Sequence, residues 1–552
     1  MWRIHHLDRG QGDCDHRADR AEWRASREMA LIAESKAESA GSLSGVDVRI
    51  AVENFGPIEK GEVELRPLTI FVGASNTGKT YFSVLIYSLH NTLEGLSRIP
   101  VVVRQVSRLL ERLAGGLVAS DEERAAISRE AEELGDKLSL EDRPLKFSDL
   151  PERAREEAKK TLLGPDGAAE GLIDELRRCF DLSSASGLVR AREGIDRAKV
   201  SLGVREGMRD LWRVDATVSD SGSAVAGEIE DMVLVPARGP KSELGNRLEQ
   251  IGAHLEAGQI PKALAELPYV IGLDSKEAYY LPAARSGIMQ SHRVIASSVM
   301  ARATRAGLER VSDLPTFPGP LADFMQQLID HRGQEDGFRR GSKRSEVVQT
   351  IANELEDGTL GGEILVQRQS PGGYPEFLYM PRNATQSIGL GRVSSMVTEL
   401  APMVLFLRDG MGAGDTLIIE EPEAHLHPAA QTEMAHTLAR LVNAGVRVVA
   451  TTHSDWLLKA FGNLIREGEF NEETGGSVDE SAAQARLRPQ DVGVWLFRRG
   501  ENGGGSTVDE IPFDRIEGIE PSDYEDIAEQ LYNRSAELQN RLAETTAGGV
   551  PE

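Results

Sequence analysis

The stretch GASNTGKT occupies residues 73–80 and directly follows an apolar, β-branched run that ends at Val72. It fits the pattern G-x-x-x-x-G-K-[ST], in which glycines let consecutive backbone N–H groups curl around a phosphate. The segment YFSVLIYSLHNTL that follows predicts a helix, whose N-terminus directs the positive end of its dipole at the same phosphate. A strand before the loop and a helix after it therefore predict a nucleotide-binding α/β fold.

The loop also predicts the ligands. Lys79 is expected to reach the β- and γ-phosphates, and the Thr80 hydroxyl to hold Mg²⁺. The chain has no N-K-x-D motif for reading guanine, which favours ATP over GTP. We therefore predict ATP and Mg²⁺ as cofactors, bound by the residues Gly73, Ala74, Ser75, Asn76, Thr77, Gly78, Lys79 and Thr80.

A second apolar strand, TLII, ends in the carboxylates Glu420 and Glu421. Such a strand end lies at the carboxyl edge of a sheet, where ligands of α/β folds bind. Glu420 is expected to coordinate Mg²⁺ directly or through water, although the usual residue at this position is Asp. Glu421 is expected to orient or deprotonate the attacking water. The alternative is a charged strand end that faces solvent.

His453 follows a third apolar strand in the segment ATTHS. A single histidine is more often structural than catalytic. Its position one strand after the acidic pair favours a hydrogen bond from His453 to a γ-phosphate, while Glu421 acts on the water.

Three segments occur in a characteristic order: ENFGPIEKGEVEL with FVGASNTGKT, then EEPEAHLHPAAQ, then ATTHSDWLL. They resemble the ATPase heads of the OLD/RecF/SMC group, and most closely prokaryotic AAA-domain ATPases of the OLD-like kind. The resemblance covers about residues 46–95 and 270–500. It implies an α/β P-loop NTPase with an ABC-ATPase-like head, a mixed sheet and an inserted helical subdomain. The Toprim nuclease domain of OLD nucleases has no counterpart after Ser454, where the remaining acidic residues are scattered.

The resemblance also implies residue roles. Glu421 matches the catalytic glutamate, His453 the switch histidine, and residues 423–428 the dimer-contacting loop. Ser394 and Ser395 stand where the ABC-type signature occurs, at the start of an apolar helix, although VSSMVTE departs from the usual LSGGQ. In such heads the signature serine of one subunit caps the γ-phosphate held by the other, so the resemblance implies a homodimer with ATP between the heads.

Arg285 and Gln290, in YLPAARSGIMQ, are candidates for the glutamine-loop position of such heads. The alternative for Arg285 is an ion pair at the surface or lining the core.

The composition and charge of the chain limit the partners and the cellular location that can be expected. The 552 residues carry a formal net charge of -25, which argues against holding nucleic acid by overall charge. The two cysteines have no metal-type spacing, and no apolar run is long enough to cross a membrane, so a cytoplasmic protein without membrane contact is expected.

The basic cluster between Arg339 and Arg344 is either a DNA contact or an ordinary solvated loop. Met29 is a second candidate start.

The expected organisation has a tail, two head segments separated by a mainly helical insertion, and a C-terminal hairpin end with a helix. A second insertion is expected at about 305–345. The predicted boundaries are 1–45, 46–95, 96–269, 270–500 and 501–552.

These features favour an ATPase whose nucleotide-dependent head pairing gates a DNA-related or antiviral defence process. A separate nuclease or toxin effector is implied by the resemblance alone. The alternative is a nucleotide-gated scaffold or sensor with negligible turnover. The energy subunit of a membrane transporter is disfavoured by the long insertions and the altered signature.

Overall fold

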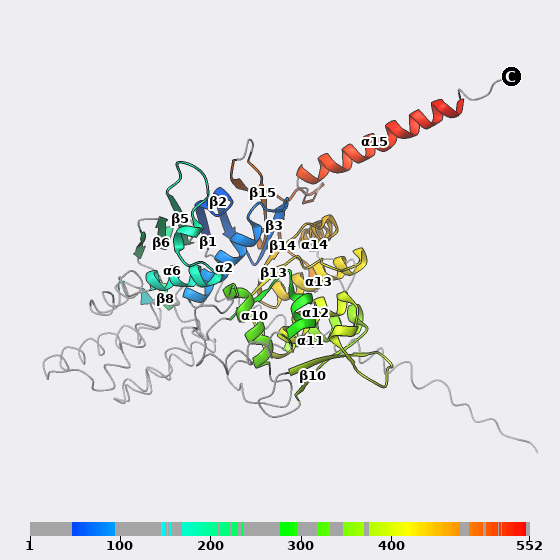
Figure 1. The fold of residues 1–552 in the computed structure, drawn as a ribbon, viewed down its shortest axis with the longest axis horizontal. Coiled ribbons are helices and arrows are strands. Elements are labelled where there is room, and N and C mark those ends of the chain that lie inside the picture. The colour runs from blue at the N-terminus through cyan, green and yellow to red at the C-terminus, as the bar shows by residue number, and fades with distance from the viewer. Residues whose placement is uncertain are drawn as a thin grey trace, which may run out of the picture.

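A computed structural model describes the architecture of the chain (Figure 1). The described residues are 47–93, 145–146, 148, 152, 155, 168–206, 209–219, 222–229, 233–235, 277–292, 294, 317–331, 346–368, 375–474, 485–500, 504–516, 518–519 and 522–547. The predicted N-terminal tail and the basic cluster at 339–344 lie outside them, as does most of the predicted helical insertion.

The described strands form an eleven-stranded sheet with the order β7-β6-β5-β1-β2-β16-β15-β3-β14-β13-β9. One half is parallel: β3, β9, β13, β14 and β15 all run in one direction. Every residue of β3 and of β13 is buried, as expected for parallel strands covered on both faces. These strands are β3 (Leu68–Gly73), β9 (Ala278–Leu281), β13 (Thr416–Glu420), β14 (Arg447–Thr451) and β15 (Val492–Arg498).

The other half of the sheet is largely antiparallel. Strand β15 forms the predicted hairpin with β16, and β16 pairs in parallel with β2 to join the two halves. Strand β1 pairs with β2 and with β5, and β6 and β7 extend the sheet outward. These strands are β1 (Asp47–Phe55), β2 (Ile58–Leu65), β5 (Arg197–Glu206), β6 (Arg209–Ser219), β7 (Gly222–Ile229) and β16 (Ser506–Ile511). The predicted mixed sheet is therefore confirmed.

Part of the stretch predicted to be helical differs from that prediction. Within 96–269 the structure describes one helix, α6 (Ala168–Cys179), and the strands β5, β6 and β7. A two-stranded sheet, β4 (Leu145–Lys146) with β8 (Val233–Val235), also lies there. The buried side chains of β5 occur at every second position, which is the strand period. They are Ala198, Val200, Leu202 and Val204.

Helices cover both faces of the parallel half. On one face, Phe71 of β3 packs against Phe82 of α2, with ring centroids 5.5 Å apart. On the other, Ile70 and its neighbours join one core cluster with α12, α13 and α14. Helix α6 lies against α2, and α10 against β9. The helices are α2 (Lys79–Leu93), α10 (Gly319–Asp330), α11 (Glu346–Leu355), α12 (Ser395–Asp409), α13 (Pro428–Asn443) and α14 (Asp455–Thr474).

A three-stranded sheet packs beside α12 and contains the antiparallel hairpin of β10 and β11. Its strands are β10 (Gly362–Arg368), β11 (Pro375–Pro381) and β12 (Ile388–Gly389). A π-helical turn, η4 (Glu356–Leu360), continues α11, and the 3-10 turns are η2 (Ala185–Leu188), η5 (Leu390–Arg392) and η7 (Pro489–Asp491).

The predicted C-terminal helix is α15 (Ser522–Ala547), which projects away from the other described elements (Figure 1). Among the residues that the structure describes, no helix combines the length and the apolar content needed to cross a bilayer.

Candidate functional site at the carboxyl edge of the sheet

The strand order brings the three predicted motifs to one edge. Strand β14 lies between β3 and β13, and all three run parallel. In register, Thr451 lies opposite both Phe71 and Glu420. The phosphate loop follows β3, Glu421 follows β13, and the segment with His453 follows β14. They therefore share the carboxyl edge, where ligands of open α/β sheets bind.

The loop between β3 and α2 adopts backbone conformations that its sequence permits. Gly73 has φ 129° and Gly78 has φ 103°, values that L side chains rarely adopt. A Cβ at Gly78 would lie 2.6 Å from Cγ1 of Ile58. Asn76, with φ 63°, occupies the left-handed region that asparagine tolerates. Ala74, Ser75 and Asn76 are exposed, and Thr77 is buried and donates to the Ala74 carbonyl at 2.8 Å.

Lys79 begins α2 and is only 6% exposed. Its Nζ donates to the backbone carbonyls of Gly73 and Ala74, each at 2.8 Å, so the ammonium lies inside the loop. Burial lowers the pKa of Lys79 to about 8, and the Glu421 and Glu423 carboxylates oppose this shift. Thr80, next along the helix, is exposed at the same end.

The Glu420 carboxylate is buried and held on both sides. Its Oε1 accepts a hydrogen bond from the Tyr280 hydroxyl at 2.8 Å, and its Oε2 accepts one from the Ala283 N–H at 2.9 Å. Both donors come from β9 and the turn after it. A carboxylate has about four acceptor positions, so two remain after these bonds.

Glu421 has φ 44°, an uncommon value for a residue other than glycine. Contacts on both sides hold this backbone: its N–H donates to the Thr451 carbonyl at 2.9 Å, and its own carbonyl accepts from Arg285 Nη2 at 3.0 Å. The side chain of Glu421 is half-buried, and its charge raises the pKa of Lys79.

Arg285 forms a buried ion pair, which was one of the two interpretations of its sequence position. It is 1% exposed, and its Nη2 lies 2.6 Å from Oε1 of Glu399 in α12. Its Nη1 donates to the Glu420 carbonyl at 2.5 Å. The guanidinium therefore supports the end of β13 from within the core, while the other glutamine-loop candidate, Gln290, is exposed.

Glu423 ties the acidic loop to the segment that carries His453. Its Oε1 accepts the backbone N–H of His453 at 2.7 Å, and burial raises the pKa of its carboxyl. The sequence placed Glu423 only in a dimer-contacting loop, and no local pattern indicated its bond to the backbone of His453.

His453 is half-buried, and Ser454 after it caps α14 by accepting the Leu457 N–H at 3.1 Å. Burial lowers the pKa of His453, and the charge of Lys79 lowers it further, whereas Glu421 opposes both. The imidazole is therefore neutral at pH 7 and carries one N–H donor.

Ser394 and Ser395 lie at the N-terminus of α12, as predicted. Ser394 is the cap residue, its carbonyl accepts the Val397 N–H at 3.1 Å, and both serines are exposed. Neither side chain has a hydrogen bond to the phosphate loop among the described residues. A helix N-terminus with two exposed hydroxyls is available to a group outside this chain.

The residues at the edge fit a nucleotide with Mg²⁺. The first turn of α2 has backbone N–H groups without intrahelical partners, and the buried ammonium of Lys79 stands beside them. No group of three or more His, Cys, Asp or Glu side chains among the described residues is arranged to hold a metal by itself. Mg²⁺ with ATP does not require one, because it keeps waters and phosphate oxygens in addition to one or two protein ligands.

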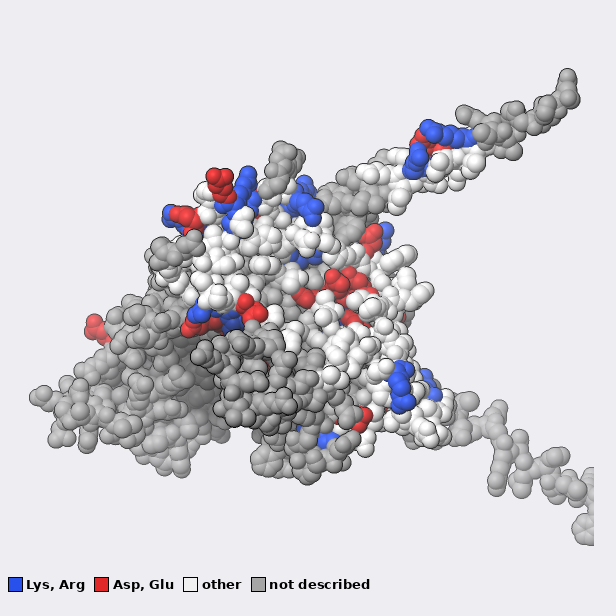
Figure 2. Space-filling model, in the orientation of Figure 1, with Lys and Arg blue, Asp and Glu red and all other residues white. Residues whose placement is uncertain are grey.

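One face of the molecule shows how its charged side chains are distributed. Figure 2 shows acidic side chains gathered near the middle of this face, near α13, while the Lys and Arg side chains are scattered. On the described part of this face, no continuous basic patch marks a nucleic-acid groove.

Comparisons with known proteins agree with the ATPase interpretation. Residues 314–458 match the family described as AAA ATPase domain. This range includes β13, His453 and α10, the last of which lies in the predicted second insertion. No curated protein matches the chain.

Among solved structures, the chain is similar to an Smc head bound to the C-winged helix domain of ScpA. The identity is 10%, 84% of this chain and 97% of that chain are covered, and the TM-score is 0.37. It is also similar to an Smc head with an extended coiled coil bound to the C-terminal domain of ScpA from Pyrococcus furiosus. The identity is 11%, 88% of this chain and 100% of that chain are covered, and the TM-score is 0.34. A third similar structure is the SMC head domain from Thermotoga maritima. The identity is 8%, 84% of this chain and 98% of that chain are covered, and the TM-score is 0.30. These scores are low, and the fold class rests on the strand order and the loop geometry.

Proposed function

We propose that this chain, which carries an AAA ATPase domain on a P-loop α/β fold, binds ATP and hydrolyses it between two paired heads. One observation carries the proposal. The phosphate loop with the buried ammonium of Lys79, Glu421 and His453 follow three neighbouring parallel strands at a single sheet edge, and the charge of Glu421 acts on the pKa of both Lys79 and His453. Phosphate binding, activation of water and a hydrogen bond to the terminal phosphate need these three groups together.

Binding is assigned to the loop and to the start of α2. The glycine conformations let the backbone approach a phosphate closely, and the N–H groups of the first turn point toward it. Lys79 exchanges its two carbonyl contacts for phosphate oxygens, which restores the positive charge that burial disfavours.

Hydrolysis is assigned to Glu421 and His453. Glu421 accepts a proton from the attacking water, and its backbone is held at the end of β13 by the Thr451 carbonyl and the Arg285 guanidinium. Neutral His453 donates its N–H to the terminal phosphate, and Glu423 holds the backbone that carries it. Mg²⁺, held by Thr80 and Glu420, supplies charge neutralisation of the phosphate oxygens.

Head pairing is supported by the exposed N-terminus of α12. Ser394 and Ser395 lie there without a side-chain partner in the phosphate loop, so a second copy can present them to the nucleotide of the first. The further step, in which pairing gates a DNA-related or antiviral process through a separate effector, is supported only by the resemblance of the motifs.

The test is ATP turnover by the full chain with Mg²⁺, comparing the wild type with Lys79→Ala and Glu421→Gln. We expect turnover in the wild type, loss of both ATP binding and turnover in Lys79→Ala, and loss of turnover with retained binding in Glu421→Gln. Removal of Glu421 is expected to lower the rate by roughly 10²–10⁴-fold, the usual contribution of a general base. Equal turnover in wild type and Glu421→Gln would overturn the assignment.

A scaffold that binds ATP with negligible turnover is the second candidate. The observations that favour it are Glu420 in place of the usual Asp and the departure of VSSMVTE from the usual signature. Tight ATP binding by a wild type without turnover would select this function.

A further inference from the structure

We infer that Tyr280 is a positioning residue for divalent-cation binding, because its hydroxyl fixes the Glu420 carboxylate at the edge of the nucleotide site. The inference rests on the proposed function and deepens it. Tyr280 was not among the residues that the motifs indicated, and it lies 140 residues before its partner along the chain.

The contact is buried and well defined. Tyr280 is 3% exposed and Glu420 is 6% exposed, and the hydroxyl donates to Oε1 at 2.8 Å. Strands β9 and β13 are neighbours, with Tyr280 opposite Ile418, so the phenol side chain extends along β13 to reach the residue at its end. The Ala283 N–H binds the other oxygen at 2.9 Å. Together they fix the rotation of the carboxylate and leave its remaining acceptor positions for a cation or its water.

Tyr280 acts as a donor. An ionised carboxylate can only accept, so the phenol O–H donates and Oε1 of Glu420 is the acceptor. A hydrogen bond of this kind to a metal ligand sets the orientation and basicity of that ligand.

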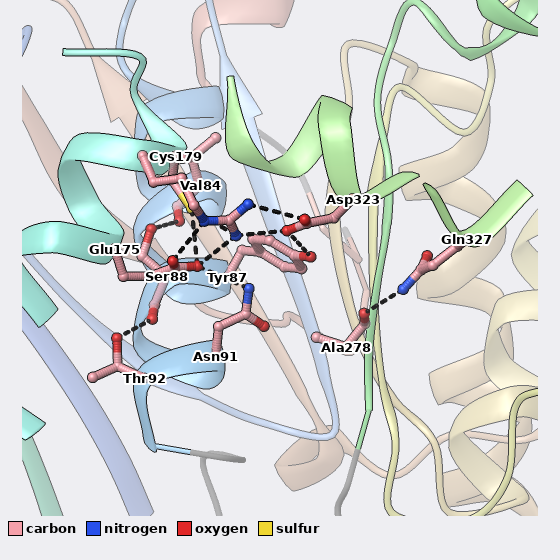
Figure 3. A network of polar contacts seen from close by, with 11 residues as sticks. Val84, Tyr87, Ser88, Asn91, Thr92, Glu175, Cys179, Ala278, Asp323 and Gln327 are labelled. Atoms are coloured by element: carbon pink, nitrogen blue, oxygen red, sulfur yellow. Dashed lines mark hydrogen bonds and ion pairs between the residues drawn. The ribbon is translucent and has the colours of Figure 1, made fainter. Parts of the chain in front are cut away.

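The ring of Tyr280 is itself held from the P-loop helix. Tyr87 of α2 packs against it edge-on, with ring centroids 5.4 Å apart and an interplanar angle of 69°. The Tyr87 hydroxyl donates to Asp323 of α10 at 2.9 Å, and Asp323 is paired with Arg178 of α6 at 2.6 Å. Figure 3 shows Tyr87 in this network between the three helices. The position of Tyr280 is therefore set by α2, α6 and α10 as well as by its own strand.

Tyr279 provides a matched control. It is the preceding residue on β9, is 4% exposed, and its hydroxyl donates to Glu277 at 2.9 Å. Because side chains alternate along a strand, Tyr279 points to the opposite face, away from Glu420. Tyr279→Phe therefore removes an equivalent buried hydroxyl without touching the site.

The experiment measures Mn²⁺ affinity by electron paramagnetic resonance, with the full chain and a non-hydrolysable ATP analogue. We expect Tyr280→Phe to weaken Mn²⁺ binding by about 10–100-fold, the range found for partners of metal ligands. Tyr279→Phe should leave the affinity unchanged, and binding of the analogue without metal should be equal in all three proteins, which shows that the site is folded.

Glu420→Gln supplies the second comparison. If Tyr280 acts through Glu420, Tyr280→Phe has no further effect on Mn²⁺ affinity in the Glu420→Gln background. Two results overturn the inference: equal Mn²⁺ affinity in wild type and Tyr280→Phe, or a loss on adding Tyr280→Phe to Glu420→Gln as large as the loss it causes in the wild type. A wild type that does not bind the analogue at all instead contradicts the proposed function, so the two failures are distinguishable.

Discussion

The ammonium of Lys79 is surrounded by backbone carbonyl oxygens inside the phosphate loop, where water is largely excluded. Burial disfavours its charged form, while phosphate binding requires that form. The pKa of about 8 is the result of this conflict in the protein without nucleotide. A bound phosphate raises the pKa again, and ATP binding is therefore linked to proton uptake.

We predict that ATP affinity falls as the pH rises above about 8. Below that pH the ammonium is already present, and above it binding must recruit a proton, so the dissociation constant rises by at most about tenfold per pH unit. Titration of ATP between pH 7 and 9 measures this slope. In Lys79→Arg the guanidinium stays charged, and the slope should disappear whatever the absolute affinity. An unchanged slope in that variant would show that protonation of Lys79 is not linked to ATP binding.

The backbone N–H of His453 donates to the carboxylate of Glu423 at 2.7 Å. We predict that Glu423→Ala lowers turnover by roughly tenfold while ATP binding is retained, the effect of losing one charge-assisted hydrogen bond. Glu423→Gln keeps an acceptor oxygen and should retain most of the activity. Single-turnover kinetics separates binding from chemistry, and equal rates for Glu423→Ala and wild type would contradict the role of Glu423.

At the scale of elements, Arg285 joins the turn after β9 to the end of β13 and to α12. It contacts the carbonyls of Glu420 and Glu421 as well as the carboxylate of Glu399. Burial raises the pKa of Glu399 to about 7 even though Arg285 favours its charged form. The pair therefore orients the catalytic strand end at a considerable desolvation cost.

We predict that Arg285→Met destabilises the chain by about 3–5 kcal/mol, because it leaves the Glu399 carboxyl buried without its partner. Urea unfolding, followed by intrinsic fluorescence, measures the loss. The double variant Arg285→Met with Glu399→Leu should recover much of it, since no uncompensated charge remains. Equal stability of wild type and Arg285→Met would show that the pair does not hold these elements together.

The sequence allowed the elements with strong local signals to be predicted. The phosphate loop follows β3 as expected, the hairpins β10–β11 and β15–β16 are present, and α12 is the predicted apolar helix. Strands β5 to β7 were missed because residues such as Arg and Glu in them also favour helices, although Val200, Leu202 and Val204 alternate with the strand period.

The contacts that shape the site could not be predicted in this way. Tyr280 and Glu420 are 140 residues apart along the chain, and Arg285 and Glu399 are 114 residues apart. Such pairs depend on which strands become neighbours, and local patterns carry no information about this. The motifs located the groups to which we assign the nucleotide chemistry, whereas the residues that hold those groups required the three-dimensional arrangement.

For the whole molecule, the layout places the nucleotide groups and the exposed serines on different elements. The loop, Glu421 and His453 lie at the edge of the parallel strands, and Ser394 begins α12. If two copies meet face to face, each supplies the helix N-terminus that the other's nucleotide lacks. Pairing then depends on bound ATP, and hydrolysis separates the copies.

The molar mass of Glu421→Gln in solution, measured by light scattering during size exclusion, tests this pairing most directly. With ATP and Mg²⁺ we predict the mass of two chains, because the variant binds ATP without hydrolysing it. Without nucleotide, or when Lys79→Ala is added to the same variant, we predict the mass of one chain. A Glu421→Gln protein that binds ATP and keeps the mass of one chain would contradict the head-pairing mechanism.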